Sequence, residues 1–100
     1  MAEKVKGKTA SGFKFAIDED VFKDWRFLQA IRKANNGTAE EQLDAGFELV
    51  SHLFNDQKEE ERFYSFLAKQ NGGRVPADVV GTEVGEIMKI VKEANKAAKN

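Results

Sequence analysis

Apolar and polar residues alternate near the amino terminus of the chain. Phe13, Phe15 and Ile17 occupy every second position, which is typical of a β-strand with one buried face. Residues near Val5 to Thr9 are the expected partner of this strand, so the pattern allows either a hairpin or a single strand. Because an isolated hairpin is only marginally stable in water, we expect the three apolar side chains to pack on helices.

The pattern then changes to helical spacing and predicts a first helix from about Glu19 to Ala34. The acidic run at 18–20 offers an N-cap and first-turn carboxylates, and the run at 35–37, Asn-Asn-Gly, ends the helix. The predicted buried stripe consists of Val21, Trp25, Leu28 and Ile31. Phe22 and Phe27 flank this stripe.

A second helix begins at a capping box, Thr38 followed by Glu41, and continues to about Phe54. Its apolar arc consists of Leu43, Gly46, Phe47, Leu49, Val50, Leu53 and Phe54. Its polar arc consists of Glu40, Glu41, Asp44, Glu48 and His52. Since about half of its circumference is apolar, we expect this helix to be central, with the other helices and the hairpin around it.

Two more helical regions follow. The third helix repeats the capping pattern at Asp56 and Glu59 and ends at the run 71–73, Asn-Gly-Gly. Its apolar positions are Phe63, Phe66 and Leu67. Pro76 suits the first turn of a fourth helical region, which the pair Gly81-Thr82 is expected to interrupt. The apolar arc beyond that pair consists of Val84, Ile87, Met88, Val91 and Ala94.

These elements predict a mainly α fold, a compact bundle of about four short amphipathic helices with a short N-terminal β-hairpin or strand. We expect residues 11–98 to form a single helical domain and residues 1–10 to form an arm that is either flexible or part of the hairpin. A length of 100 residues allows one modest core. No segment approaches the roughly 20 apolar residues of a membrane span, and the amino terminus lacks a signal-peptide core. The sequence therefore predicts a cytosolic protein with no membrane partner.

The composition removes much common enzyme chemistry. Cysteine is absent and His52 is the single histidine, so thiol nucleophiles, cysteine zinc sites and paired imidazoles are excluded. The carboxylate clusters lie where helices begin, and we interpret them as caps rather than as acid–base pairs or metal ligands. We interpret His52 as a solvated side chain one turn after Glu48. We therefore expect no enzyme activity, no cofactor and no metal.

The net charge of −1 hides two regional patterns. The second helix lacks lysine and arginine, and three of its acids are spaced i, i+4, i+8, where like charges repel. We interpret its acidic face and nearby aromatic residues as a partner-binding site: Phe22, Trp25, Phe27, Glu40, Glu41, Asp44 and Glu48. Lysines line one edge of the last helix and form a candidate self-association edge: Lys89, Lys92, Lys96 and Lys99. Ordinary solvated helix faces are the alternative interpretation of both patterns.

The order of the short motifs resembles a known family. The run at 11–20, Ser-Gly-Phe-Lys-Phe-Ala-Ile-Asp-Glu-Asp, is followed by Asp24-Trp25, by an acidic leucine-containing helix and by the run at 73–76, Gly-Arg-Val-Pro. Over about Ser11 to Val91 this order is similar to the small tail assembly chaperones of long-tailed bacteriophages and prophages. The resemblance implies a non-enzymatic protein of the host bacterial cytoplasm that is absent from the mature virion. Its client would be the long helical tape measure protein, kept soluble while tail tube subunits polymerise around it.

A multicopy chaperone of this kind is also expected to self-associate. The alternative from another class is a small regulatory or nucleic-acid-binding helical domain that uses Lys4, Lys6 and Lys8 or the lysine edge of the last helix. A small enzyme with a concave pocket of convergent polar groups is a third class. Because 16 basic residues balance 17 acidic ones, no global field favours nucleic acid or an anionic membrane.

Overall fold

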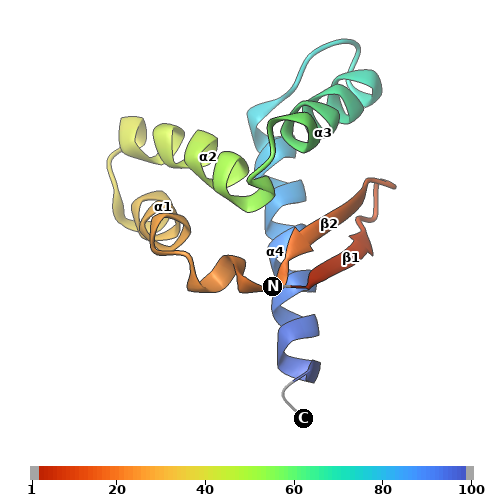
Figure 1. Ribbon diagram of the computed structural model, residues 1–100. Helices are drawn as coiled ribbons and strands as arrows, with labels where there is room; N and C mark the ends of the chain where they lie inside the picture. Colours follow the sequence, from red (N-terminus) through yellow and green to blue (C-terminus); the bar gives the residue numbers. More distant parts are fainter. Residues whose placement is uncertain (1–2, 99–100) are drawn as a thin grey trace.

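The chain folds into four α-helices, one 3₁₀-helix and an N-terminal β-hairpin in the part that the structure describes (Figure 1). The structure is a computed structural model and describes residues 3–98. The elements are β1 Lys4–Lys8, β2 Lys14–Asp18, η1 Glu19–Lys23, α1 Trp25–Asn36, α2 Ala39–Phe54, α3 Gln57–Gln70 and α4 Ala77–Ala98. The predicted mainly α fold is confirmed, and the amino-terminal residues pair as a hairpin rather than leaving a single strand.

The hairpin is antiparallel, with Gly7 paired to Phe15. A Cβ atom at Gly7 would lie 2.6 Å from the Phe15 ring. Because glycine has no Cβ atom, the ring can pack directly over this position. Gly12 closes the turn with a φ of 104°, a conformation that favours glycine. The side chains of Phe13, Phe15 and Ile17 are buried, as their alternation predicts.

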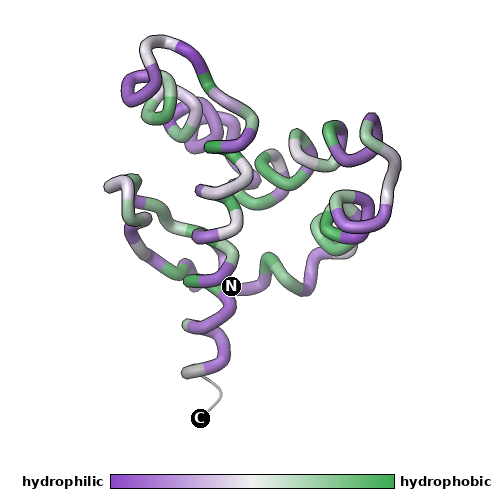
Figure 2. The backbone as a smooth tube through the Cα atoms, turned by 180° about the vertical axis from the view of Figure 1, so that it is seen from behind, coloured by the Kyte–Doolittle hydropathy of each residue, from purple (hydrophilic) through white to green (hydrophobic). Residues whose placement is uncertain are grey.

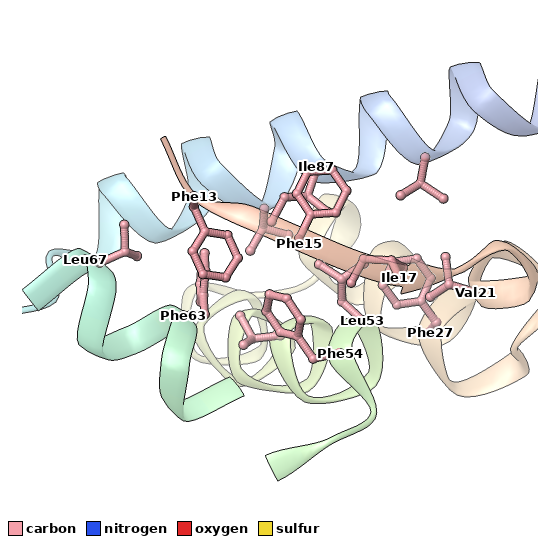
Figure 3. Packing of buried hydrophobic residues seen from close by; sticks show 13 residues of the cluster. Phe13, Phe15, Ile17, Val21, Phe27, Leu53, Phe54, Phe63, Leu67 and Ile87 are labelled. Atoms are coloured by element: carbon pink, nitrogen blue, oxygen red, sulfur yellow. The ribbon is translucent and has the colours of Figure 1, made fainter. Parts of the chain in front are cut away.

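The core lies on the inner face of β2. Figure 3 shows β2 between α4 on one side and α2 and α3 on the other. The Phe13 ring meets Phe54 and Phe63 edge-on, at centroid distances of 6.1 and 5.2 Å. The second helix, α2, contacts α1, α3, α4 and β2, as expected for a central helix. One aromatic cluster therefore joins the hairpin to two helices that are distant in sequence.

The predicted first helix is wrong in its bounds, because it is divided at Asp24. The Asp24 carboxylate accepts hydrogen bonds from the backbone N–H groups of Arg26, at 2.8 Å, and Phe27, at 3.3 Å. Asp18, the expected N-cap, makes no side-chain capping bond, and residues 19–23 form the 3₁₀-helix instead. Asp24 thus begins a new helix, α1, with its own rotational phase.

This break also makes the predicted buried stripe of the first helix wrong. Trp25 is 72% exposed and Leu28 is also exposed, whereas Phe27 is completely buried. Val21, which precedes the break, is buried as predicted, and Ile31 is half-buried. The predicted stripe assumed one continuous helix across Asp24. Because α1 begins anew at that residue, the stripe selects the wrong side of α1.

The bounds and the cap of α2 are confirmed. The Thr38 hydroxyl accepts from the Glu41 N–H at 3.2 Å, and the Glu41 carboxylate accepts from the Thr38 N–H at 3.0 Å. The predicted apolar arc is only half correct. Val50, Leu53 and Phe54 are buried, whereas Leu43 is 59% and Phe47 63% exposed. The amino-terminal half of α2 therefore extends past the elements that cover its other half.

The last two helices largely follow the sequence pattern. Asp56 caps α3, and positive φ angles at Gly72 and Gly73 follow its end. The predicted interruption at Gly81-Thr82 is wrong, because α4 is continuous over Ala77–Ala98. The Thr82 hydroxyl donates to the Asp78 carbonyl one turn earlier, at 3.0 Å, so this polar side chain finds its partner within the continuous helix. Val84, Ile87 and Val91 are buried, which confirms the main apolar positions of the last helix.

Candidate protein-binding surface

Most exposed large hydrophobic side chains gather on α1 and α2. Within residues 3–98, four of the five such side chains belong to these helices: Trp25, Leu28, Leu43 and Phe47. We call α1 and α2 together the α1–α2 lobe. Figure 1 shows the lobe on the side of the molecule away from the hairpin, and Figure 2 shows hydrophobic positions continuing along α2. The lobe therefore presents apolar surface that the core does not use.

On α2, the exposed residues continue a buried stripe. Leu43, Phe47, Val50 and Phe54 are spaced i, i+4, i+7, i+11 and so share one side of the helix. The last two lie in the core, and the first two lie in solvent. Exposed Glu40 and Asp44 lie beside the exposed pair. We call Glu40, Leu43, Asp44 and Phe47 the α2 face.

On α1, the exposed apolar side chains are accompanied by basic residues, whereas those on α2 are accompanied by acidic ones. Trp25, Leu28 and Arg32 are spaced i, i+3, i+7 and share one side of α1. The helix carries three basic residues, Arg26, Arg32 and Lys33, and no acidic one. We call Trp25, Leu28 and Arg32 the α1 face. The two helices of the lobe thus combine apolar pairs with opposite charges.

An open groove of about 980 Å³ runs between α1 and α2. Trp25, Leu28 and Arg32 line it from α1, and Glu48 and His52 line it from α2. An ion pair connects the two walls, because the Lys33 Nζ lies 3.1 Å from a Glu48 carboxylate oxygen. His52 is half-buried at this open groove, on the polar side of α2 as predicted.

The acidic residues predicted to bind a partner have different roles. Glu40 and Asp44 are exposed and belong to the α2 face. Glu48 is paired with Lys33, and the Glu41 carboxylate is part of the capping box. The hydrogen bonds to the Thr38 backbone N–H and hydroxyl, and then the charge of Lys33, hold the pKa of Glu41 below its ordinary value. Only the first two carboxylates are therefore available for a partner.

Of the predicted aromatic binding residues, only Trp25 is freely exposed. The prediction is wrong for Phe27, which is buried, and for Phe22, which is half-buried against the core. Their rings pack edge-to-face at a centroid distance of 5.5 Å. This pair holds η1 against α1, so neither ring can serve as a free docking group.

Leu28, Leu43 and Phe47 are surface residues that the sequence pattern assigns to the core. Their spacing is the same as that of buried residues in the same helices. No local signal separates the two groups, because exposure depends on where the neighbouring helices end.

The basic surfaces lie elsewhere on the molecule. Lys89 and Lys92 on α4 are exposed, as is Lys96, and none of them joins an ion pair within the described residues. Lys99, the fourth member of the predicted edge, lies outside the described residues. On the hairpin, the three predicted lysines of β1 are exposed: Lys4, Lys6 and Lys8.

Within residues 3–98, no three carboxylate or imidazole side chains lie close enough together to hold a metal ion. No helix in the same range is long and apolar enough to cross a bilayer. Comparisons of the chain with protein-family models, curated proteins and solved structures found no match.

Proposed function

We propose that the protein is a non-enzymatic tail assembly chaperone of a long-tailed bacteriophage or prophage. In this role it binds the tape measure protein in the host bacterial cytoplasm, keeps it soluble during tail tube assembly and is absent from the mature virion. Two lines of reasoning support the proposal. One is the resemblance of the sequence motifs, and the other is the exposed apolar surface of the α1–α2 lobe.

The apolar surface of the lobe is the observation that carries the proposal. Leu43 and Phe47 are 59% and 63% exposed, although they continue a stripe that packs the core one turn later. Exposed apolar side chains gathered on one part of a small protein mark an interaction surface. Two such residues one helical turn apart suit an amphipathic helix, the form expected of a long helical client.

The charges on α2 narrow the kind of client segment. Glu40 and Asp44 are exposed beside the apolar pair, and no lysine or arginine occurs between Ala34 and Gln57. Acidic groups along one side of a docking surface favour partners that have basic groups along the matching side. The preferred client segment is therefore an amphipathic helix with a basic edge.

Co-expression with the tape measure protein tests this function. We expect the client to remain in the soluble fraction only when the wild-type chain is present, and to be recovered in complex with it. A chain with Leu43→Glu and Phe47→Glu should lose much of this effect, whereas Val75→Glu, at an exposed apolar position outside the lobe, should keep it. If the client is equally insoluble with and without the wild-type chain, the proposal is wrong.

A nucleic-acid-binding domain is the second candidate, and one observation favours it. The outward side of the hairpin carries Lys4, Lys6 and Lys8, and Lys14 lies directly opposite Lys8. Directly opposed like charges destabilise a strand pair, so hairpin stability does not explain this arrangement. Binding to DNA or RNA that falls steeply with salt would support this candidate. Absence of binding at low salt would exclude it.

A further inference from the structure

The α1 face and the α2 face are complementary to each other. The α1 face offers Trp25 and Leu28 beside Arg32, and the α2 face offers Leu43 and Phe47 beside carboxylates. We propose that the α1 face of one copy docks on the α2 face of a second copy. The free protein then covers its own apolar surface, and, resting on the proposed function, a client helix competes with the second copy for the α2 face.

The charges support a second copy as the occupant. The α1 helix has Arg26, Arg32 and Lys33 and no acid. Lys33 is engaged with Glu48, whereas Arg32 of the α1 face joins no ion pair within residues 3–98. Glu40 and Asp44 are likewise without ion-pair partners in that range. Opposite charges around two apolar pairs orient one surface on the other and disfavour like surfaces.

The two faces of one molecule cannot meet each other. The α1 face borders the groove between the two helices. On α2 the groove is lined by Glu48 and His52, and Leu43 and Phe47 each lie five residues before one of them, about 140° around the helix. The α2 face therefore points away from the groove and from the α1 face of the same molecule. Pairing between copies is head-to-tail, so that each added copy leaves one face of each kind open.

The lysine edge of α4 is a weaker basis for self-association. In the described part of α4, Lys89, Lys92 and Lys96 are exposed, but no large hydrophobic side chain is exposed beside them. Exposed ion pairs contribute little to association, because both charges remain solvated. Contact between the α1 and α2 faces adds the burial of apolar side chains to the charge pairing, and therefore carries the association.

The first experiment measures the mass of the wild-type chain by sedimentation velocity over a series of protein concentrations. We expect the average mass to rise with concentration, and the emission of Trp25, the single tryptophan, to shift to the blue as its indole leaves water. A chain with Lys89→Gln, Lys92→Gln and Lys96→Gln should behave like the wild type. A wild-type chain that remains monomeric with unchanged emission would overturn the proposal.

The second experiment mixes two variants that each keep one intact face. The α1-face variant carries Trp25→Glu and Leu28→Glu, and the α2-face variant carries Leu43→Glu and Phe47→Glu. Alone, each should be monomeric. Mixed, they should form a pair of one copy each and nothing larger, because the pair has no further intact face. The α2-face variant then holds the only tryptophan, so its emission should shift to the blue on mixing.

Circular dichroism first checks that both variants are helical. If a double variant does not fold, single charge-reversal variants replace it. Arg32→Glu should weaken association, and adding chains with Asp44→Arg should restore it, because the two reversed charges attract each other. Lack of an emission shift on mixing, or association of either variant alone as strong as that of the wild type, would contradict head-to-tail docking.

The outcomes for docking and for function are separable. If the wild-type chain is monomeric but keeps the tape measure protein soluble, self-docking is wrong and the chaperone function stands. If it self-associates through these faces but has no effect on the client, the docking stands and the chaperone function is wrong.

Discussion

Glu83 is a buried carboxylate that fixes the hairpin to α4. Its Oε1 atom accepts hydrogen bonds from the hydroxyls of Thr9, at 2.9 Å, and Ser11, at 2.7 Å. One turn away, Glu86 accepts from the Ala10 N–H at 2.6 Å. Hydroxyl and amide donors of the turn thus compensate a carboxylate that has lost most of its water.

Replacement of Glu83 should therefore destabilise the fold. Glu83→Ala leaves the buried Thr9 hydroxyl without its acceptor, and we expect a loss of about 1–3 kcal/mol in the free energy of unfolding, measured by urea denaturation. Glu83→Gln retains an amide oxygen as acceptor and should lose less. Glu93→Ala, at an exposed position of α4, serves as the control and should change little. Equal losses in all three would show that the turn contacts contribute nothing.

Phe27 and Trp25 give a second test at the residue scale, because the structure exposes Trp25, which was predicted in the buried stripe, and buries Phe27, which was predicted to flank it. Phe27→Ala should lower the free energy of unfolding by about 3–5 kcal/mol, since it empties a filled part of the core. Trp25→Ala should change it by less than about 0.5 kcal/mol at concentrations where the chain is monomeric. Thermal unfolding followed by circular dichroism measures both. A larger effect at Trp25 than at Phe27 would mean that α1 packs in the other phase.

At the scale of elements, the starts of helices decide which side chains face the core. The cap at Asp24 sets the phase of α1, and the box of Thr38 and Glu41 sets the start of α2. Each cap satisfies backbone N–H groups that the first turn of the helix leaves without partners. A shift of one residue in such a start rotates every following side chain by about 100°.

The Asp24 cap leads to a direct comparison with Asp18. Asp24→Ala should lower the free energy of unfolding by about 1 kcal/mol and reduce helicity at the start of α1. Asp18→Ala removes only an exposed ion pair with Lys4, at 3.8 Å, and should have the smaller effect. Amide chemical shifts of Arg26 and Phe27 report the cap itself. Unchanged shifts in the Asp24 variant would rule out this capping bond.

The Thr38–Glu41 box predicts a pH dependence. Because the folded chain lowers the pKa of Glu41, its contribution to stability is complete above the pKa that this residue has in the unfolded chain. The contribution is lost as the pH falls through the lower pKa of the folded state. Thr38→Ala removes the hydroxyl but keeps the backbone N–H, which is the larger cause, so the pKa of Glu41 should rise only part of the way toward its ordinary value and the acid sensitivity should weaken, whereas Thr38→Ser should preserve both. Carboxyl ¹³C titration follows the pKa directly, and an unchanged value in Thr38→Ala would contradict the contribution of the hydroxyl.

At the scale of the whole molecule, the aromatic core and the exposed apolar side chains lie in different parts of the protein. Helix α4, β2, α3 and the carboxyl-terminal half of α2 enclose the aromatic core (Figure 3). Trp25 and Leu28 of α1 and Leu43 and Phe47 of α2 are exposed to solvent. Solvent-exposed parts of a protein open more readily in local fluctuations than a packed core, so we expect α1 to open more readily than α4.

Hydrogen exchange tests this division. We expect backbone amides of α1 to exchange faster than those near Ile87 and Val91 in α4, which are buried against the core. Association of copies through the α1 and α2 faces should slow exchange in the lobe at high protein concentration and leave α4 unchanged. Uniform exchange rates across both regions would instead indicate a single cooperative unit.

Local sequence by itself determined the identity and spacing of most elements. The alternation in β2, the capping box of α2, the Asp56 cap and the glycines after α3 each act within a few residues, so they can be recognised without the rest of the fold. The acidic character of α2 was visible in the same way. Two candidate partner-binding carboxylates, Glu40 and Asp44, and the indole of Trp25 were therefore identified before the structure.

Only the tertiary structure decided which apolar side chains are surface and which are core. Leu43 and Phe47 have the same chemistry and helical spacing as Val50 and Phe54, but β2, α3 and α4 cover only one end of that stripe. Trp25 is exposed and Phe27 is buried because the Asp24 cap begins a new helix where the sequence pattern predicted a continuous one. Burial depends on contacts between segments distant in sequence, and a periodic pattern describes only the side of a helix, not how far its neighbours extend along it.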